Sequence, residues 1–288
     1  MIILALERSG PRAESRGRRV GISNPLNDRF FMKKIIVLLY LVFLTVGATA
    51  PQLITHHRFD SPDQNALLHP PNSIHWLGTD ELGRDMLSRI LYGARVSLGC
   101  ALIATLISGL LGLFVGGLAA FKGGLVETAL MRLVDIFYAI PDLLLAILFG
   151  VFFGTGFWGL VLSLSAFGWV GIARMVRGEL LRNKTALFVE AGQALGLSQK
   201  RLFFFHLLPQ IKSVFFTVLL LKIPALILAE STLSFVGLGL KPPYASWGVL
   251  VAEGYSAMRF YPHLIIFPSL VIFLTMLSLK TLKTKRIS

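Results

Sequence analysis

The segment EAGQALG at residues 190–196, followed by FHLLP at residues 205–209, decides the fold of this chain. It is polar, is interrupted by glycine, and lies between two strongly apolar blocks. Because apolar blocks of about 20 residues cross a bilayer, a polar segment between two of them must lie outside the lipid. The sequence therefore predicts a membrane protein with an exposed loop between two crossing helices.

Composition supports this prediction. The chain of 288 residues is 55% hydrophobic and only 15% charged, with a mean hydropathy of +0.71. A soluble fold of this length could not bury so much apolar surface, whereas a fold in lipid does not need to. The single cysteine, Cys100, lies in an apolar stretch, so a disulfide framework or a CxxC site is excluded.

The apolar blocks predict an all-α polytopic membrane protein with six transmembrane helices. The third and fourth spans are separated only by a short turn that contains two glycines. The predicted spans are residues 35–53, 94–121, 129–153, 157–175, 214–235 and 263–280.

The second span carries a stripe of small residues at intervals of four. Such a stripe lets the backbone of another helix approach closely. We expect it to serve helix packing rather than gating. Its members are Ser108, Gly112, Gly116 and Ala120.

The distribution of Lys and Arg predicts the orientation. Basic residues are concentrated before the first span, in the loop at 183–212 and after the last span, and the positive-inside rule places these segments in the cytoplasm. The net charge of +13 follows from this topology and does not indicate nucleic-acid binding, because the basic residues are scattered over several loops. The predicted external side keeps Arg58, Arg84, Arg89, Lys241 and Arg259.

The segments outside the spans divide the chain further. Lys33 and Lys34, the apolar run and Ala48-Thr49-Ala50 also fit a cleavable signal peptide, which is an alternative to a first transmembrane helix. The basic segment 1–34 is expected to be disordered or to lie upstream of the true start, which Met32 would supply. The predicted divisions are 1–34, the first helix at 35–53, an external loop at 54–93, a core of five spans at 94–280, and a short basic tail at 281–288.

The polar loop is predicted to contain two short helices. Asn183 or Thr185 can cap the first, which carries an apolar stripe at helical spacing. Gly196 suits the left-handed position that ends a helix, and Ser198 can cap the second. We expect the second helix to end before Pro209, since proline cannot continue a helix through its own position.

Two further motifs flank the core. The segment HWLGTDELGRD at 75–85 predicts that Thr79 caps a helix with acidic residues in its first turn. The segment AESTLSFVGLG at 229–239 ends the fifth span and places Glu230 inside it. An ionisable residue in a span is a candidate for the transport path, although Glu230 could instead hold nearby backbone. The candidate path residues are Glu230, Ser231 and Ser234.

These motifs carry a resemblance to a known family. The loop with Leu208-Pro209 resembles the EAA loop of bacterial ABC importer permeases, and the segments at 75–95 and 229–248 resemble peptide and nickel importer permeases. Over residues 35–277 the chain resembles the dipeptide and oligopeptide (DppC/OppC-like) branch. In the loop, Gly192 stands where the family usually has Ala, which lowers helix propensity by up to ~1 kcal/mol.

The resemblance implies a permease subunit of an ATP-driven peptide importer in the bacterial inner membrane, with both termini in the cytoplasm. It implies a second homologous permease, two ATPase subunits and an external solute-binding protein as partners. Closure of the ATPases would push the loop, as a coupling helix, and rock the spans between inward- and outward-facing states. The implied docking residues are Glu190, Ala191, Gly192, Gly196, Leu208 and Pro209.

Several alternatives stay open at this point. The solute could be nickel or another small molecule, and the family's longer tail after the sixth span allows a decayed, non-transporting subunit. An intramembrane enzyme, a passive channel and a scaffold are the rival classes. ATP is expected on the partner subunits and no cofactor on this chain, because the sequence has no P-loop. The six histidines form no HExxH motif, so no metal site is predicted.

Overall fold

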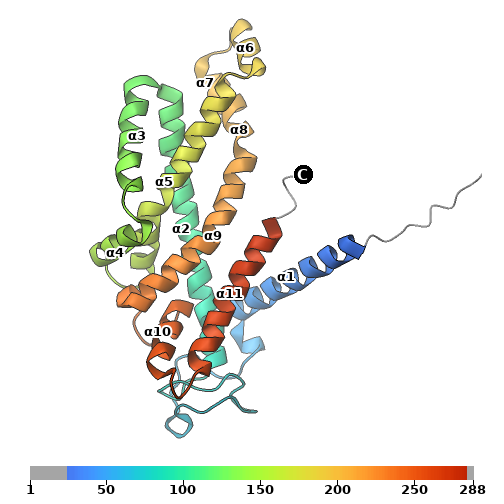
Figure 1. Ribbon diagram of the computed structural model, residues 1–288, viewed down its shortest axis with the longest axis vertical. Coiled ribbons are helices and arrows are strands. Elements are labelled where there is room, and N and C mark those ends of the chain that lie inside the picture. The colour runs from blue at the N-terminus through green and yellow to red at the C-terminus, as the bar shows by residue number, and fades with distance from the viewer. Residues whose placement is uncertain (1–24, 284–288) are drawn as a thin grey trace, which may run out of the picture.

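Two long helices, α2 (Met86–Lys122) and α5 (Phe157–Lys184), form the axis of the molecule (Figure 1). The structure is a computed structural model and describes residues 25–283. Most of the predicted basic segment 1–34 and the last part of the tail therefore lie outside the described residues. Within the described part, the regular elements are helices, and the one isolated bridge joins Thr79 to Asp85.

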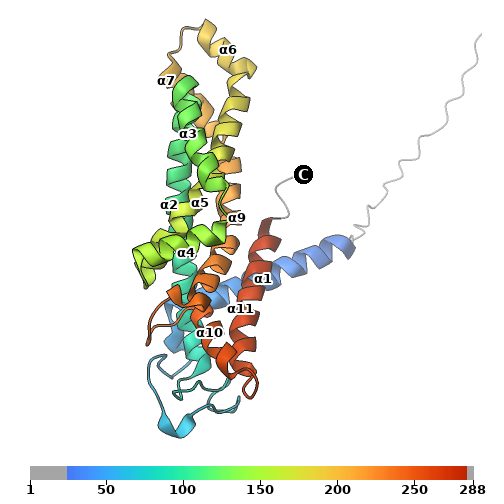
Figure 2. The same ribbon diagram turned by 60° about the vertical axis from the view of Figure 1, so that its left-hand side comes forward.

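The remaining helices pack along this axis. Short helices α6 and α7 lie at one end of the molecule, here called the α6 end, and irregular chain from residue 50 to residue 85 lies at the other, here called the loop end (Figures 1 and 2). The other elements are α1 (Pro25–Thr49), α3 (Gly124–Tyr138), α4 (Asp142–Phe153), α6 (Leu187–Ala194), α7 (Gln199–Leu202), α8 (Leu208–Gln210), α9 (Lys212–Leu233), α10 (Trp247–Ala257) and α11 (His263–Lys283).

Four helices in the described part are long and apolar enough to cross a membrane. They are α2, α5, α9 and α11, and they confirm four of the predicted spans. The first predicted span forms the apolar part of α1, and it is a shorter helix of residues Ile35–Thr49. The count of six is not reached by length and composition, which give four spans, or five when a bent pair counts as one.

The bent pair corrects the predicted third span at 129–153. The structure breaks this segment into α3 and α4, which meet at an angle of 92°. Pro141 stands at the break, and its missing N–H and fixed φ end the first helix and begin the next. The apolar run is continuous in hydropathy and so predicts a single span with a kink at Pro141, whereas the structure has two helices at 92°.

The loop end contains a further helix, α10, which was not among the predicted elements. Helix α10 lies between α9 and α11 and begins at Trp247, after Ser246 accepts a hydrogen bond from the backbone N–H of Val249 at 3.3 Å. The indole of Trp247 is fully buried and donates to the carbonyl of Ile90 in α2 at 3.0 Å. This contact ties α10 to the start of the central helix.

The stripe of small residues on α2 faces α5. A Cβ at Gly112 would lie 2.7 Å from Cβ of Ile172 and 2.9 Å from the carbonyl oxygen of Trp169. A Cβ at Gly116 would lie closer still to the carbonyl oxygen of Ala173. The packing role that the sequence predicts for the stripe is therefore confirmed, and the helix that it admits is α5.

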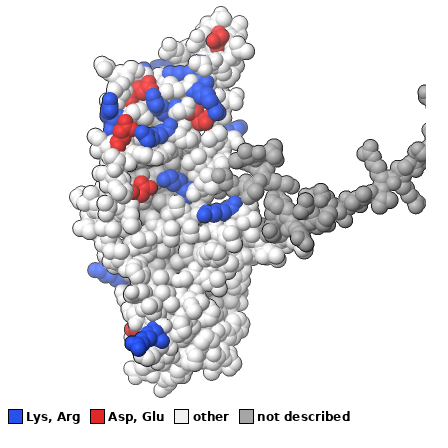
Figure 3. Space-filling view, in the orientation of Figure 1, with Lys and Arg blue, Asp and Glu red and all other residues white. Residues whose placement is uncertain are grey.

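Charged side chains are unevenly placed along the axis. Figure 3 shows them gathered near the α6 end of this face, above a broad band with few charges. Three ion pairs involve residues of α5: Arg174 pairs with Asp135 and Arg177 with Glu127, both in α3, and Arg182 pairs with Glu179 in α5 itself. A wide apolar band beside a charged end is the surface that a bilayer requires.

Adding one methyl group at the α2–α5 contact tests this packing. Gly112→Ala is expected to destabilise the protein by about 1–3 kcal/mol, because the new Cβ overpacks a contact made by backbone and a β-branched side chain. The matched control is Gly171→Ala in α5, where a Cβ meets no atom within 4 Å. Thermal unfolding of the detergent-purified variants measures both. Equal unfolding temperatures for the two variants would contradict the assignment.

Candidate functional site

The polar loop leaves the axis at the end of α5. The hydroxyl of Thr185 donates to the carbonyl of Arg182 at 3.1 Å, so this side chain closes α5. Helix α6 then begins after Ala186 without a side-chain cap. The prediction that Asn183 or Thr185 caps α6 is therefore wrong, because Asn183 lies in the last turn of α5 and Thr185 is the residue at which α5 ends.

The turn between α6 and α7 follows the prediction. Gly196 has φ +76°, the left-handed conformation that ends a helix, and the N–H of Leu197 returns to the carbonyl of Gly192 at 3.0 Å. Ser198 caps α7 by accepting from the N–H of Arg201 at 3.4 Å. Both residues act within their own turn, which is why the sequence alone predicts them.

The helical path continues through Pro209, which corrects the prediction that the helix ends before this residue. After α7, residues Phe203–Leu207 form a π turn in which the N–H of Leu208 donates to the carbonyl of Phe203. The extra residue in this turn lets α8 begin with Pro209 in its first turn, where the missing N–H needs no partner. The path from α7 to α9 is therefore almost continuously helical.

The predicted docking residues differ in exposure. Glu190, Ala191, Gly196 and Pro209 are exposed, and Leu208 is half-buried. Gly192 is buried, and a Cβ there would lie 2.6 Å from Cδ2 of Leu202. The glycine therefore lets α6 pack on α7 and offers no surface of its own. Beside the acidic Glu190, two apolar side chains of the loop stand 82% exposed: Leu187 and Leu195.

The loop is attached firmly to the axis. Val189 of α6 and Phe203 and Leu207 of the π turn are buried with Val176 and Leu180 of α5. The Nζ of Lys184 donates to the carbonyl of Ala120 near the end of α2 at 2.5 Å. An exposed, partly apolar surface on a rigid base can bind another protein and transmit its movement to α2 and α5.

The predicted path residues form a buried polar cluster. The carboxylate of Glu230 accepts from the hydroxyls of Ser97 in α2 at 2.9 Å and of Ser234 at 2.8 Å, and Glu230 is fully buried. The backbone N–H of Trp247 donates to Ser97 at 3.1 Å. The cluster therefore joins α2, α9 and α10. Ser231 is buried beside it, and its hydroxyl has no hydrogen-bond partner among the described residues.

A second polar cluster at the loop end was not predicted. The guanidinium of Arg89 is fully buried and pairs with Asp80 at 2.6 Å and with Glu253 of α10 at 2.5 Å. Arg84 pairs with the same Asp80 at 2.7 Å. These residues lie in the motif at 75–95, but their partner Glu253 is 164 residues away in the sequence, so only the fold brings them together.

The start of α2 corrects the prediction for Thr79. Asp85 caps α2 by accepting from the N–H of Ser88 at 2.8 Å. The hydroxyl of Thr79 instead donates to the carbonyl of Ala66 and accepts from the N–H of His69 at 2.8 Å, so it holds the loop and caps no helix. The motif contains three acidic residues, Asp80, Glu81 and Asp85, and the sequence alone did not indicate that Asp85 is the cap.

A bundle of apolar helices with a charged end and a projecting two-helix loop places the chain in the class of polytopic α-helical membrane proteins. The family model for the binding-protein-dependent transport system inner membrane component matches residues 85–285. The chain belongs to this family, the permease subunits of ABC importers.

Named relatives support the same assignment. The dipeptide transport system permease protein DppC of Bacillus subtilis is 38% identical over 258 residues, which are 88% of this chain and 79% of the relative. The oligopeptide permease OppC of the same organism is 33% identical over 87% of this chain and 81% of its own length. The glutathione permease GsiD of Pectobacterium atrosepticum is 35% identical over 88% and 85%.

Solved structures show the same fold. A chain of the MetNI methionine ABC transporter in an inward-facing form matches with a TM-score of 0.55 at 18% identity, over 69% of this chain and 96% of its own. A chain of an amino acid ABC transporter crystallised with histidines matches with a TM-score of 0.55 at 17% identity, over 68% and 91%. The described helices therefore share their arrangement with known permeases.

Replacing Arg89, the buried cation at the loop end, tests whether the second polar cluster stabilises the fold. Arg89→Gln is expected to cost about 3–5 kcal/mol of stability, because it leaves the carboxylate of Asp80 without its closest counter-charge. Arg58→Gln is the control, since Arg58 makes an exposed pair with Asp60 and its loss is expected to leave the unfolding temperature unchanged. Thermal unfolding in detergent measures both, and an Arg89 variant as stable as the control would refute the role given to the cluster.

Proposed function

We propose that this chain is the transmembrane permease subunit of an ATP-driven importer of short peptides. The observation that carries the proposal is the exposed loop of α6 to α8, held rigidly on the ends of α2 and α5. In this arrangement the loop docks into an ATPase subunit, and closure of the ATPases tilts the central helices. The membrane core alternates between inward- and outward-facing states as a result.

The proposal includes three kinds of partner, which the family of the chain implies. Two ATPase subunits bind ATP and contact the α6 end, a second homologous permease completes the path, and an external solute-binding protein delivers the peptide at the loop end. This chain itself carries neither ATP nor another cofactor. In this proposal the α6 end and both termini lie in the cytoplasm, which agrees with the gathering of Lys and Arg near that end.

The names of the relatives support a peptide as the solute. The three relatives named above transport dipeptides, oligopeptides and glutathione according to their names, and each covers more than four fifths of this chain. Glu230 with Ser231 and Ser234 is the proposed part of the path in this subunit. Its carboxylate is buried in the single chain, so its exposure to peptide requires the movement of α10 or α9 that transport involves.

Reversing one charge on the loop tests docking. Glu190→Lys is expected to abolish copurification with the ATPase subunits and ATP-driven uptake while leaving membrane insertion intact, because Glu190 is exposed and stabilises no other part of the chain's core. Gly196→Trp is expected to do the same by placing a bulky residue at φ +76°. Glu81→Lys at the loop end is the control for charge reversal. Normal uptake by both loop variants would show that docking occurs elsewhere.

Uptake by the complete transporter tests the solute. Proteoliposomes that contain all partners are expected to accumulate a labelled dipeptide or oligopeptide. Accumulation should require ATP on the side of the membrane that the α6 end faces. Unlabelled peptide should compete, whereas Ni²⁺ should not. Accumulation of Ni²⁺ without peptide transport would overturn the peptide assignment and leave the permease assignment standing.

A further inference from the structure

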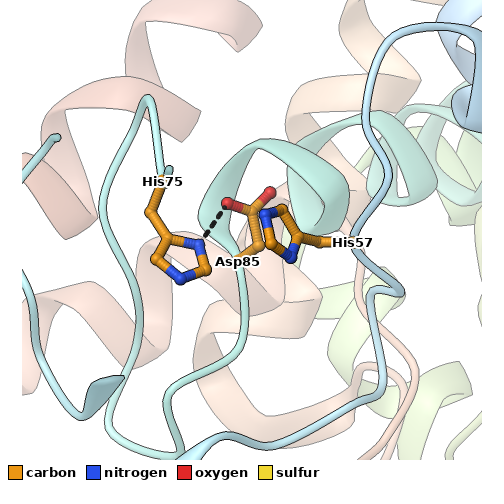
Figure 4. A group of neighbouring side chains, drawn as sticks. All are labelled: His57, His75 and Asp85. Atoms are coloured by element: carbon orange, nitrogen blue, oxygen red, sulfur yellow. Dashed lines mark hydrogen bonds and ion pairs between the residues drawn. The ribbon is translucent and has the colours of Figure 1, made fainter. Parts of the chain in front are cut away.

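Three side chains meet at the loop end in a way that the transport proposal does not use: His57, His75 and Asp85 (Figure 4). One possible ligand atom from each lies within 4.8 Å of the other two. Asp85 belongs to the start of α2, and the two histidines belong to separate parts of the irregular chain before it. In Figure 4 the two rings flank the carboxylate.

The hydrogen bonds around Asp85 hold the carboxylate and one ring in place. Its Oδ2 accepts from the N–H and from the hydroxyl of Ser88, both at 2.8 Å. Its Oδ1 lies 3.0 Å from Nδ1 of His75, and Asp85 and His75 are both buried. Outer hydrogen bonds of this kind orient the ligands of a metal ion.

His57 is positioned through its backbone. Its N–H donates to the hydroxyl of Thr55 at 3.2 Å, and its carbonyl oxygen lies 2.9 Å from the hydroxyl of Ser88, which shares its one proton between this oxygen and Asp85. These bonds place its exposed imidazole with a ring centroid 4.6 Å from that of His75. The side chain can therefore move toward the carboxylate without disturbing the backbone that carries it.

The spacing suits a small divalent ion. Ligand distances of about 2.0–2.1 Å in a tetrahedral site place neighbouring ligand atoms about 3.3 Å apart. The pair of His75 and Asp85 is near this separation, and a shift of about 1.5 Å in the exposed His57 ring brings in the third ligand. On binding, the metal takes the place of the proton between Nδ1 of His75 and Oδ1 of Asp85, and the neutral ring then carries its one proton on Nε2.

The surroundings give an ion access to the site. The three residues line one cavity of about 800 Å³, which is open to solvent and also contains His56 and His69. The nearby Asp60 is engaged elsewhere, because Arg58 donates two hydrogen bonds to it at 3.1 Å and lowers the pKa of its carboxyl. Asp63 also lines the cavity, where its carboxylate accepts from the N–H of Asn65 at 2.9 Å, but only Asp85 has a carboxylate oxygen within 4.8 Å of both histidines in the described group.

We propose that His57, His75 and Asp85 bind a divalent transition-metal ion such as Zn²⁺. Two imidazole nitrogens and one carboxylate oxygen favour ions of the Zn²⁺, Ni²⁺ and Cu²⁺ type over Mg²⁺ or Ca²⁺, which prefer oxygen ligands. Three protein ligands leave a fourth position for water. The bound ion would join two parts of the irregular chain to the first turn of α2.

Metal titration of the full chain in detergent tests this proposal. Zn²⁺ is added in competition with a chromophoric chelator, and the wild-type chain is expected to bind one ion. His57→Ala is expected to weaken Zn²⁺ binding at least tenfold, since loss of an outer hydrogen-bond partner alone costs 10–100-fold. His57 is the chosen ligand because Asp85 also caps α2. Unfolding temperatures without metal should be equal for wild type and variant.

His56→Ala is the matched control, because His56 is the exposed neighbour in the same cavity but lies outside the cluster. Its Zn²⁺ affinity is expected to equal that of wild type. The proposal is overturned if wild type shows no saturable Zn²⁺ binding at micromolar concentration, if His57→Ala binds as tightly as wild type, or if both variants weaken equally. None of these outcomes bears on transport, so the permease assignment is tested separately.

Discussion

The close approach of α2 and α5 is the constraint on which the rest of the structure depends. Where lipid surrounds the helices, burying apolar surface between them brings little advantage, and association relies on packing and hydrogen bonds. Gly112 and Gly116 remove side chains from the contact, so that Ile172 and the backbone of α5 rest directly on α2. The other helices are arranged around this pair.

Each end of the pair carries a different kind of contact. At the α6 end, the contact is mainly apolar: Val189 and Phe203 pack against α5, and Lys184 supplies one hydrogen bond to α2. At the loop end it is ionic and polar, since Arg89 joins Asp80 and Glu253 inside the protein. An apolar base holds the exposed loop of α6 to α8, whereas directional bonds fix the positions of segments that have little regular structure.

Local chemistry explains which features could be predicted from the sequence. Hydropathy predicts α2, α5, α9 and α11, because crossing lipid depends on composition within each segment. Gly196 and Ser198 act within single turns and were predicted as well. Pro141 and Pro209 both exclude an ordinary helical turn, yet one produces a 92° bend and the other a π turn. The residue type alone does not say which of the two geometries results. The ion pairs of Arg89 and the group of His57, His75 and Asp85 join segments that are far apart in the sequence, so no local pattern indicated them.

The length of α2 has a mechanical consequence. Its 37 residues form one uninterrupted helix, which at 1.5 Å per residue extends about 55 Å. A hydrocarbon layer of about 30 Å covers little more than half of that length. A helix of this length is long enough to extend beyond the lipid on both sides, and a tilt of 10° about its midpoint would displace each tip by about 5 Å in opposite directions. Arg89 and Ala120 lie near opposite ends of α2, and no break in the helix separates them.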